Sequence, residues 1–141
     1  MLMRLILSIL LLNTFLLHGQ EPATQKTRDC MARVIALDDS LGKVRNHTCE
    51  STPLSETIRQ YAFALENIDY EACPAAFSTA FQKHREAWLA LLPVTDQYSG
   101  LRGEMHVLFK QLESGEHAEQ FKSLVKAVWD TWAEIEAAMK E

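Results

Sequence analysis

FSTAFQKHREAWLAL, residues 77–91, repeats large side chains at alternating steps of four and three residues. The repeated residues are Phe77, Phe81, His84, Trp88 and Leu91. In an α-helix, residues with this spacing share one face, so the segment predicts a helix with an apolar stripe. His84 is the one polar member of the stripe. It is a core histidine with a hydrogen-bond partner, a proton carrier or a residue that binds a ligand.

Four further segments repeat apolar residues with the same steps. Their stripes are Cys30, Val34, Leu37, Leu41 and Val44; Leu54, Ile58, Tyr61, Leu65 and Ile68; Leu101, Met105, Leu108 and Leu112; and Phe121, Val125, Val128, Trp132, Ile135 and Met139. Helices are therefore predicted near residues 24–46, 53–69, 74–92, 97–113 and 116–140. No segment shows the period of two that is typical of strands. Because the connections are short, the sequence predicts an all-α, up-and-down antiparallel helical bundle of four to five helices.

Prolines mark the predicted helix ends. Thr52 and Pro53 offer an N-cap and a first-turn proline to the second helix, and Pro74 starts the third helix in the same way. Pro93 ends the third helix, because the residue before a proline resists the α conformation. Pro74 also allows an alternative, in which residues 69–74 form a kink in one long helix instead of a turn.

Glycines lie near both ends of the fourth predicted helix, residues 97–113. Gly100 and Gly103 lie near its start, and each costs up to about 1 kcal/mol in a helix interior. They lie either in the preceding loop or at a close approach of another backbone or a ligand. Gly115 separates the fourth helix from the fifth, because glycine readily takes the left-handed conformation that follows a helix.

Residues 1–20, MLMRLILSILLLNTFLLHGQ, have the organisation of a secretory signal peptide. Arg4 makes the start basic, and the apolar run that follows is shorter than the roughly 20 residues that span a bilayer. We expect cleavage after Gly19 or Gln20, which leaves a single domain, residues 21–141, in a secreted or periplasmic protein. The alternative is an uncleaved membrane anchor.

The domain that remains after cleavage is acidic. It carries 13 Lys and Arg residues against 19 Asp and Glu residues, a net charge of −6, because Arg4 is removed with the leader. The basic residues form no cluster. We therefore expect neither nucleic acid nor an anionic membrane as a partner, and no stable membrane insertion after cleavage.

Three cysteines in an oxidising compartment predict a disulfide. The first helix runs on from Cys30 over about the length that the second helix runs back, so Cys30 and Cys73 are expected at the same end of the bundle. Cys49 lies in the connection at the opposite end, beyond the roughly 7 Å between Cα atoms that a disulfide spans. The sequence therefore predicts a Cys30–Cys73 disulfide, and the alternative is three reduced thiols.

Cys49 is left over, either as a free thiol or as the link in a homodimer. The triplet Asn46-His47-Thr48 precedes it. This triplet is a glycosylation acceptor in a eukaryotic secretory pathway and has no such meaning in a bacterium.

Recognised catalytic motifs are absent from the sequence: it has no Walker loop, dinucleotide fingerprint, zinc-protease motif, nucleophile elbow or C-x-x-C pair. We therefore expect no enzymatic activity. The one candidate site is a polar layer where HREAW, residues 84–88, and RGEMH, residues 102–106, fall at similar heights on the third and fourth helices. Its candidate ligand-binding residues are His84, Trp88, Arg102, Glu104, Met105 and His106. We expect His84 to face the interior and to take its hydrogen-bond partner from residues 102–106.

Two functions remain as hypotheses. The first is a non-enzymatic binding or interaction module, whose protein or small-molecule partner the sequence does not identify. The second is a redox or metal carrier that uses His84 with His106 or Met105, because these side chains bind haem iron in bundles and imidazole binds zinc or copper. The first hypothesis is favoured, with no cofactor or metal, because no ligand motif accompanies His84.

Overall fold

The computed structural model describes residues 24–141, so the predicted signal peptide, residues 1–20, lies outside the described residues. Within residues 24–141 the regular structure is helical and contains no strand. The helices are α1 (Gln25–Thr48), α2 (Leu54–Glu66), α3 (Ala75–Leu89), α4 (Leu92–Thr95), α5 (Met105–Leu112) and α6 (Ala118–Ala138). None of these helices is long and apolar enough to cross a bilayer. The prediction of an all-α fold is confirmed.

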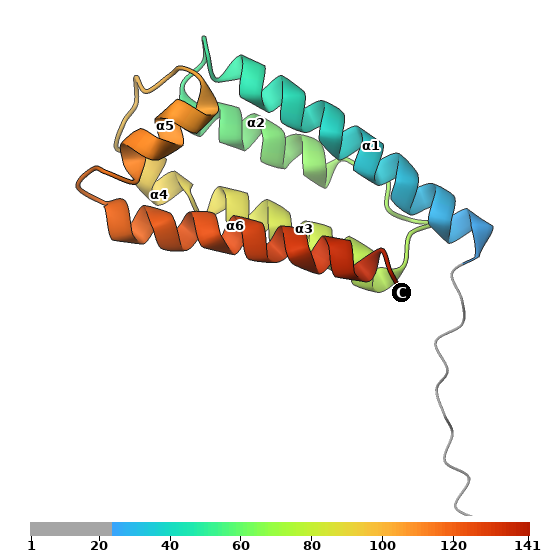
Figure 1. Ribbon diagram of the computed structural model, residues 1–141. Coiled ribbons are helices and arrows are strands. Elements are labelled where there is room, and N and C mark those ends of the chain that lie inside the picture. Colours follow the sequence, from blue (N-terminus) through green and yellow to red (C-terminus); the bar gives the residue numbers. More distant parts are fainter. Residues whose placement is uncertain (1–23) are drawn as a thin grey trace, which may run out of the picture.

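The four long helices form the up-and-down antiparallel bundle, and α4 and α5 lie at one end of it (Figure 1). α1 packs against α2, and α3 packs against both α2 and α6. In Figure 1, α1 and α2 form one layer, and α3 and α6 form the other. The backbones of α1 and α6 lie close together at far fewer positions than those of α1 and α2, α2 and α3, or α3 and α6. One side of the bundle is therefore less tightly closed than the others.

The stripe of residues 77–91 is the centre of the core, as predicted. Its five members are at most 5 % exposed. Phe81 contacts the rings of Phe77 and Trp132 edge-on, with centroids 5.1 and 6.5 Å apart. Near the other end of the bundle, Phe121 of α6 is completely buried and meets the ring of Phe109 edge-on, with centroids 5.2 Å apart. Burying each such side chain contributes roughly 1.5–3 kcal/mol, so this cluster is a main source of stability.

The connection between α3 and α6 differs from the prediction. The third helix ends at Leu89, and a separate turn, α4, follows with Pro93 at its start, where a missing N–H removes no helical hydrogen bond. α5 begins at Met105 and not near residue 97. Gly103 precedes it with a φ of 149°, which a helix does not contain. The N–H of Gly103 donates to the carbonyl oxygen of Cys49 at 2.8 Å, so this glycine lies in a loop that another backbone approaches.

The starts of α2 and α3 lie one residue later than predicted. Pro53 and Pro74 have extended ψ values of 141° and 143° and occupy the cap positions. Thr52 does not cap α2 with its side chain. The N–H of Leu54 instead donates to the carbonyl oxygen of Leu101 at 2.8 Å, so a contact with the loop before α5 replaces the predicted cap.

The apolar stripe predicts the buried face of α1 only in part: Cys30 and Val34 are buried, but two other members are not. Leu37 and Val44 are 41 % and 60 % exposed, whereas Asp38 is buried and Arg45 is half-buried on the inner face. Burial of these polar groups requires partners inside the bundle, and the aromatic rings of α2 and α3 supply them, as described below. Met139, at the end of α6, is also 40 % exposed instead of buried.

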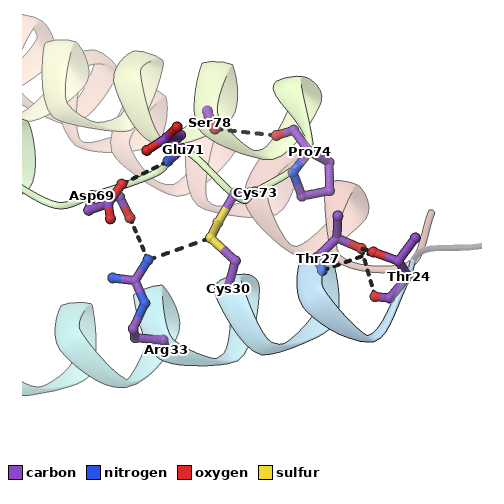
Figure 2. Close-up of a disulfide and its surroundings, with 9 residues drawn as sticks. All are labelled: Thr24, Thr27, Cys30, Arg33, Asp69, Glu71, Cys73, Pro74 and Ser78. Carbon is purple, nitrogen blue, oxygen red and sulfur yellow. Dashed lines mark hydrogen bonds between the residues drawn. A yellow bond between two sulfur atoms is a disulfide. The ribbon is translucent and has the colours of Figure 1, made fainter.

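Residues 69–74 form a turn and not a kink, and a disulfide joins this turn to α1 (Figure 2). Cys30 and Cys73 are bonded, with Cα atoms 5.2 Å apart, which confirms the predicted pair. Beside the disulfide, Nη2 of Arg33 donates to the carbonyl oxygen of Asp69 at 2.6 Å. The turn is therefore fixed to α1 by a covalent bond and by a charge-assisted hydrogen bond.

Cys49 is the free cysteine and is completely buried. Its Sγ lies 3.1 Å from the carbonyl oxygen of Asn46 and 3.2 Å from that of Gly103. Burial raises the pKa of the thiol, which lowers its reactivity. A disulfide to a second copy through Cys49 would require the α1–α2 turn to open. Asn46, the residue of the glycosylation triplet, is exposed at the end of α1.

The disulfide predicts a measurable loss of stability when either partner is replaced. Cys30→Ser and Cys73→Ser should each lower the free energy of unfolding by about 4 kcal/mol, because both open the same loop in the unfolded chain. Urea titration measures this loss. In the double variant, a reducing agent should cause no further loss. Unequal losses, or a wild-type protein whose stability does not respond to reduction, would contradict the assignment.

Candidate functional site

A cleft of about 610 Å³ opens between α1 and α6. Its lining comes from all four long helices and from α5. The lining includes the polar and aromatic residues Asp38, Arg45, Tyr61, His84, Trp88 and Trp129. Four of them, namely Asp38, Tyr61, His84 and Trp88, are at most 7 % exposed and are called the floor of the cleft here. The cleft therefore lies where α1 and α6 fail to close the bundle.

An acidic and a basic residue of α1, Asp38 and Arg45, contact the aromatic side chains of the floor. The hydroxyl of Tyr61 donates to Oδ1 of Asp38 at 2.6 Å. The guanidinium carbon of Arg45 lies 4.5 Å from the ring centre of Tyr61 and 4.1 Å from that of Trp88. The two rings meet edge to face, 5.3 Å apart, so the guanidinium lies in the corner between them. Cation–π attraction thus replaces part of the hydration that Arg45 loses.

The electrostatics of this group follow from its burial. Desolvation raises the pKa of Asp38 and of Tyr61, and it lowers the pKa of Arg45. The hydrogen bond from Tyr61 and the positive charge of Arg45 act on Asp38 in the opposite direction. The acid and the base are therefore close enough to influence each other, although no ion pair joins them.

His84 is bonded through both of its ring nitrogens. Nε1 of Trp88 donates to Nε2 of His84 at 3.1 Å. Nδ1 of His84 lies 2.9 Å from Oγ1 of Thr131, whose hydroxyl donates to the carbonyl oxygen of Val128 at 2.9 Å. Because an indole N–H only donates, Nε2 must be unprotonated, and the proton is on Nδ1. The network therefore fixes a neutral histidine in a single tautomer.

Burial and the charge of Arg45 both favour the neutral ring and lower the pKa of His84 to about 4. The predicted interior position of His84 is confirmed, since the residue is 4 % exposed. The predicted source of its partner is wrong. The partners come from α6 and from the next turn of α3, and not from residues 102–106. α6 packs closely along α3, so a threonine one helix away reaches the imidazole first.

The same bonds bear on the carrier hypothesis. A neutral imidazole binds a metal through its unprotonated nitrogen, and here that nitrogen accepts the indole N–H of Trp88. Metal or haem ligation by His84 would require this bond to break inside the core. The described part of the chain, residues 24–141, contains no group of three or more His, Cys, Asp or Glu side chains placed to hold a metal ion.

The structure brings five of the six predicted site residues to the cleft, namely His84, Trp88, Glu104, Met105 and His106. Met105 is buried, whereas His106 is exposed. Glu104 caps α5, because its carboxylate accepts the backbone N–H groups of His106 and Val107, and these bonds lower its pKa. Arg102 is not among the lining residues. Its guanidinium donates to the carbonyl oxygen of Ser51 at 3.1 Å instead.

The site residues predicted from the sequence do not include Asp38, Arg45, Tyr61 or Thr131. A signal for two of them was present. Asp38 and Arg45 are seven residues apart, and Asp38 follows Val34 by four, so both fit a helical stripe as well as Leu37 and Val44 do. The prediction took the stripe with Leu37 and Val44 because these residues are apolar, and it therefore left out Asp38 and Arg45. Thr131 had no such signal, because its role depends on the packing of α6 against α3.

Comparisons of the chain with protein-family models, with curated proteins and with solved structures find no match. The function must therefore be inferred from the cleft itself.

The neutral state of His84 predicts a pH dependence of stability. An unfolded imidazole titrates near 6.5 and the folded one near about 4, so the unfolded state binds the extra proton between these values. The contribution is complete above about pH 6.5 and falls as the pH drops, by roughly 2–3 kcal/mol between about pH 7 and about pH 4.5. Urea titrations at the two pH values measure the loss.

His84→Gln removes the titrating group and keeps an amide that both donates and accepts. The difference in stability between wild type and this variant should therefore shrink at the lower pH. The exposed His106 offers the matched control, His106→Gln, which should keep the wild-type dependence. Equal pH dependence in wild type and His84→Gln would show that His84 is not buried in the neutral form.

Proposed function

We propose that the protein is a non-enzymatic binding module that takes a small ligand into the α1–α6 cleft. The cleft itself is the observation that carries the proposal. Its volume of about 610 Å³ lies within the range of roughly 300–1,000 Å³ that is common for small-molecule sites. Most of its exposed lining is apolar, with a few polar groups at defined places, which is the composition of such sites.

Trp129 supports this proposal. It lies on α6 at the cleft and is 67 % exposed. Phe109 and Trp132 line the same cleft and are half-buried. A tryptophan that is left in water is unfavourable by roughly 25 cal/mol for each Å² of apolar surface. A ligand that covers these rings gains this free energy, so the cleft is suited to an apolar molecule.

The titratable groups of the floor favour binding over catalysis. Asp38 is bonded to Tyr61, and His84 is bonded on both sides. A general acid or base must reach a reacting atom of the substrate. The polar atoms of Asp38 and His84 are instead hydrogen-bonded to neighbouring side chains. The carrier hypothesis would need His84 to leave Trp88. An absorption spectrum of protein from its native compartment tests it, because bound haem gives a Soret band.

We also propose that the protein is exported. Residues 1–20 have the charge and apolar run of a cleaved leader. The Cys30–Cys73 disulfide is compatible with an oxidising compartment, either outside the cell or in a periplasm.

Ligand binding in the cleft is tested with the uncharged fluorescent dye phenylnaphthylamine. We expect saturable binding of one dye per chain, with increased dye fluorescence. Gly42→Leu should weaken binding at least about tenfold, because the new side chain enters the cleft. The variant should fold, since a Cβ at Gly42 meets only Nη2 of Arg45, at 3.7 Å, and glycine weakens a helix.

The matched control is Ala36→Leu, which adds the same side chain to an exposed position of α1 outside the cleft. It should keep the wild-type affinity. Equal affinity in wild type and Gly42→Leu, or no saturable binding of either this dye or its sulfonated analogue, would refute the proposed site.

Export predicts a shortened chain. Protein collected from outside the cytoplasm should begin at Gln20 or Glu21, because the leader ends there. Mass spectrometry of the intact protein measures the N-terminus. An intact Met1 in such material would refute cleavage.

A further inference from the structure

We propose that the ligand of the cleft is an acid: a compact apolar molecule with a single oxyanion, a carboxylate in the first place, that pairs with Arg45. This inference rests on the proposed function and specifies its ligand class. It follows from the position of one cation among the aromatic rings of the cleft.

Arg45 is held in place but is not neutralised by direct contact. Its guanidinium lies over Tyr61 and Trp88. Its Nε and Nη2 donate to Oδ1 of the neighbouring Asn46 at 3.2 and 3.1 Å, and this acceptor is neutral. Within residues 24–141, no carboxylate lies within 4.0 Å of its nitrogens to form an ion pair.

Other arginines of the bundle show the contrast. Arg85 is also half-buried, and it is paired with Glu66 at 2.8 Å and bonded to a backbone carbonyl. Arg59 contacts both carboxylate oxygens of Asp96 at 2.8 and 2.7 Å. Arg45 lines the cleft without such a partner. A guanidinium presents donors that match a carboxylate, so a ligand acid is the missing partner.

None of the acidic residues that line the cleft forms an ion pair with Arg45. Asp38 is buried and accepts the hydroxyl of Tyr61. Asp39 is paired with Lys43 at 2.6 Å, and both are exposed. The carboxylate of Glu104 is bonded to the backbone at the start of α5. Arg45 is therefore the lining cation that is left to meet an entering anion, whereas a cationic ligand would be repelled by it.

The rest of the cleft limits the ligand to one anionic group on an apolar body. The aromatic lining, with Phe109, Trp129 and Trp132, offers surface for flat apolar groups. The net charge of −6 after cleavage repels ligands with many negative charges, so nucleic acids and polyphosphates are disfavoured. An aromatic or alicyclic monocarboxylate combines both requirements.

Two dyes with the same ring system test the charge. Anilinonaphthalene sulfonate carries one oxyanion, and phenylnaphthylamine carries none. Wild-type protein should bind the anionic dye about tenfold more tightly or better, because a charged hydrogen-bonded partner is gained. Arg45→Met keeps an apolar stem beside the rings and should remove this preference. Its affinity for the neutral dye should change less than about threefold.

Two further variants make the result specific. Lys43→Met removes a cation that already has a carboxylate partner at the rim, so both affinities should stay within about twofold of wild type. Arg45→Lys keeps the positive charge and should retain a preference for the anionic dye, although a weaker one, because the planar fork is lost.

Each outcome decides one of the two proposals. A wild-type protein that binds the neutral dye as tightly as the anionic one, or more tightly, would overturn the assignment of the acid. Equal weakening of both dyes by Arg45→Met would overturn it too, because Arg45 would then only support the cleft. If neither dye binds saturably, the proposed function itself fails.

Discussion

The polar inner face of α1 is the constraint on which the cleft depends: Arg45 lies in the corner between Tyr61 and Trp88, and Asp38 accepts the hydroxyl of Tyr61. With this face turned inward, Leu37 and Val44 on the same helix are left in water. Leu37 and Val44 packed against α6 would have closed the bundle with apolar contacts. The polar face instead needs room and partners, and the result is a cleft along α6.

The polar groups behind the cleft form two hydrogen-bonded sets, one between α1 and α2 and one between α3 and α6, and the rings of Tyr61 and Trp88 meet between them. Asp38 on α1 accepts from Tyr61 on α2, and Trp88 on α3 donates to His84, which meets Thr131 on α6. Among the side chains that the structure describes, no buried nitrogen or oxygen lacks a hydrogen-bond partner. A satisfied network of this kind fixes side-chain rotamers in a way that apolar packing alone does not. These bonds therefore hold the side chains of the floor in one arrangement.

The periodic stripes predicted the helices and the core because burial of apolar side chains follows a period of 3.6 residues. The Cys30–Cys73 pair followed from helix lengths alone. The apolar stripe was wrong for part of the inner face of α1, where Asp38 and Arg45 are found and Leu37 and Val44 are not. It also missed Thr131 as the partner of His84, because a contact between helices is set by packing and not by the spacing in either segment. These two deviations concern the cleft lining or a direct partner of it, and local sequence preference and structure are expected to disagree at a site.

Contacts fix both ends of α1 to neighbouring parts of the bundle. At one end, the disulfide from Cys30 ties α1 to the turn before α3. At the other end, the N–H of Gly103 donates to the carbonyl oxygen of Cys49, and the guanidinium of Arg102 reaches Ser51, so the loop before α5 is tied to the α1–α2 turn. Between these fixed ends, the middle of α1 faces α6 across the cleft. A cleft with fixed walls requires little ordering when a ligand enters, and preorganisation of this kind lowers the free energy cost of binding. The strongest constraints on α1 therefore lie at its two ends and not along α6, which is the arrangement that the proposed binding function requires.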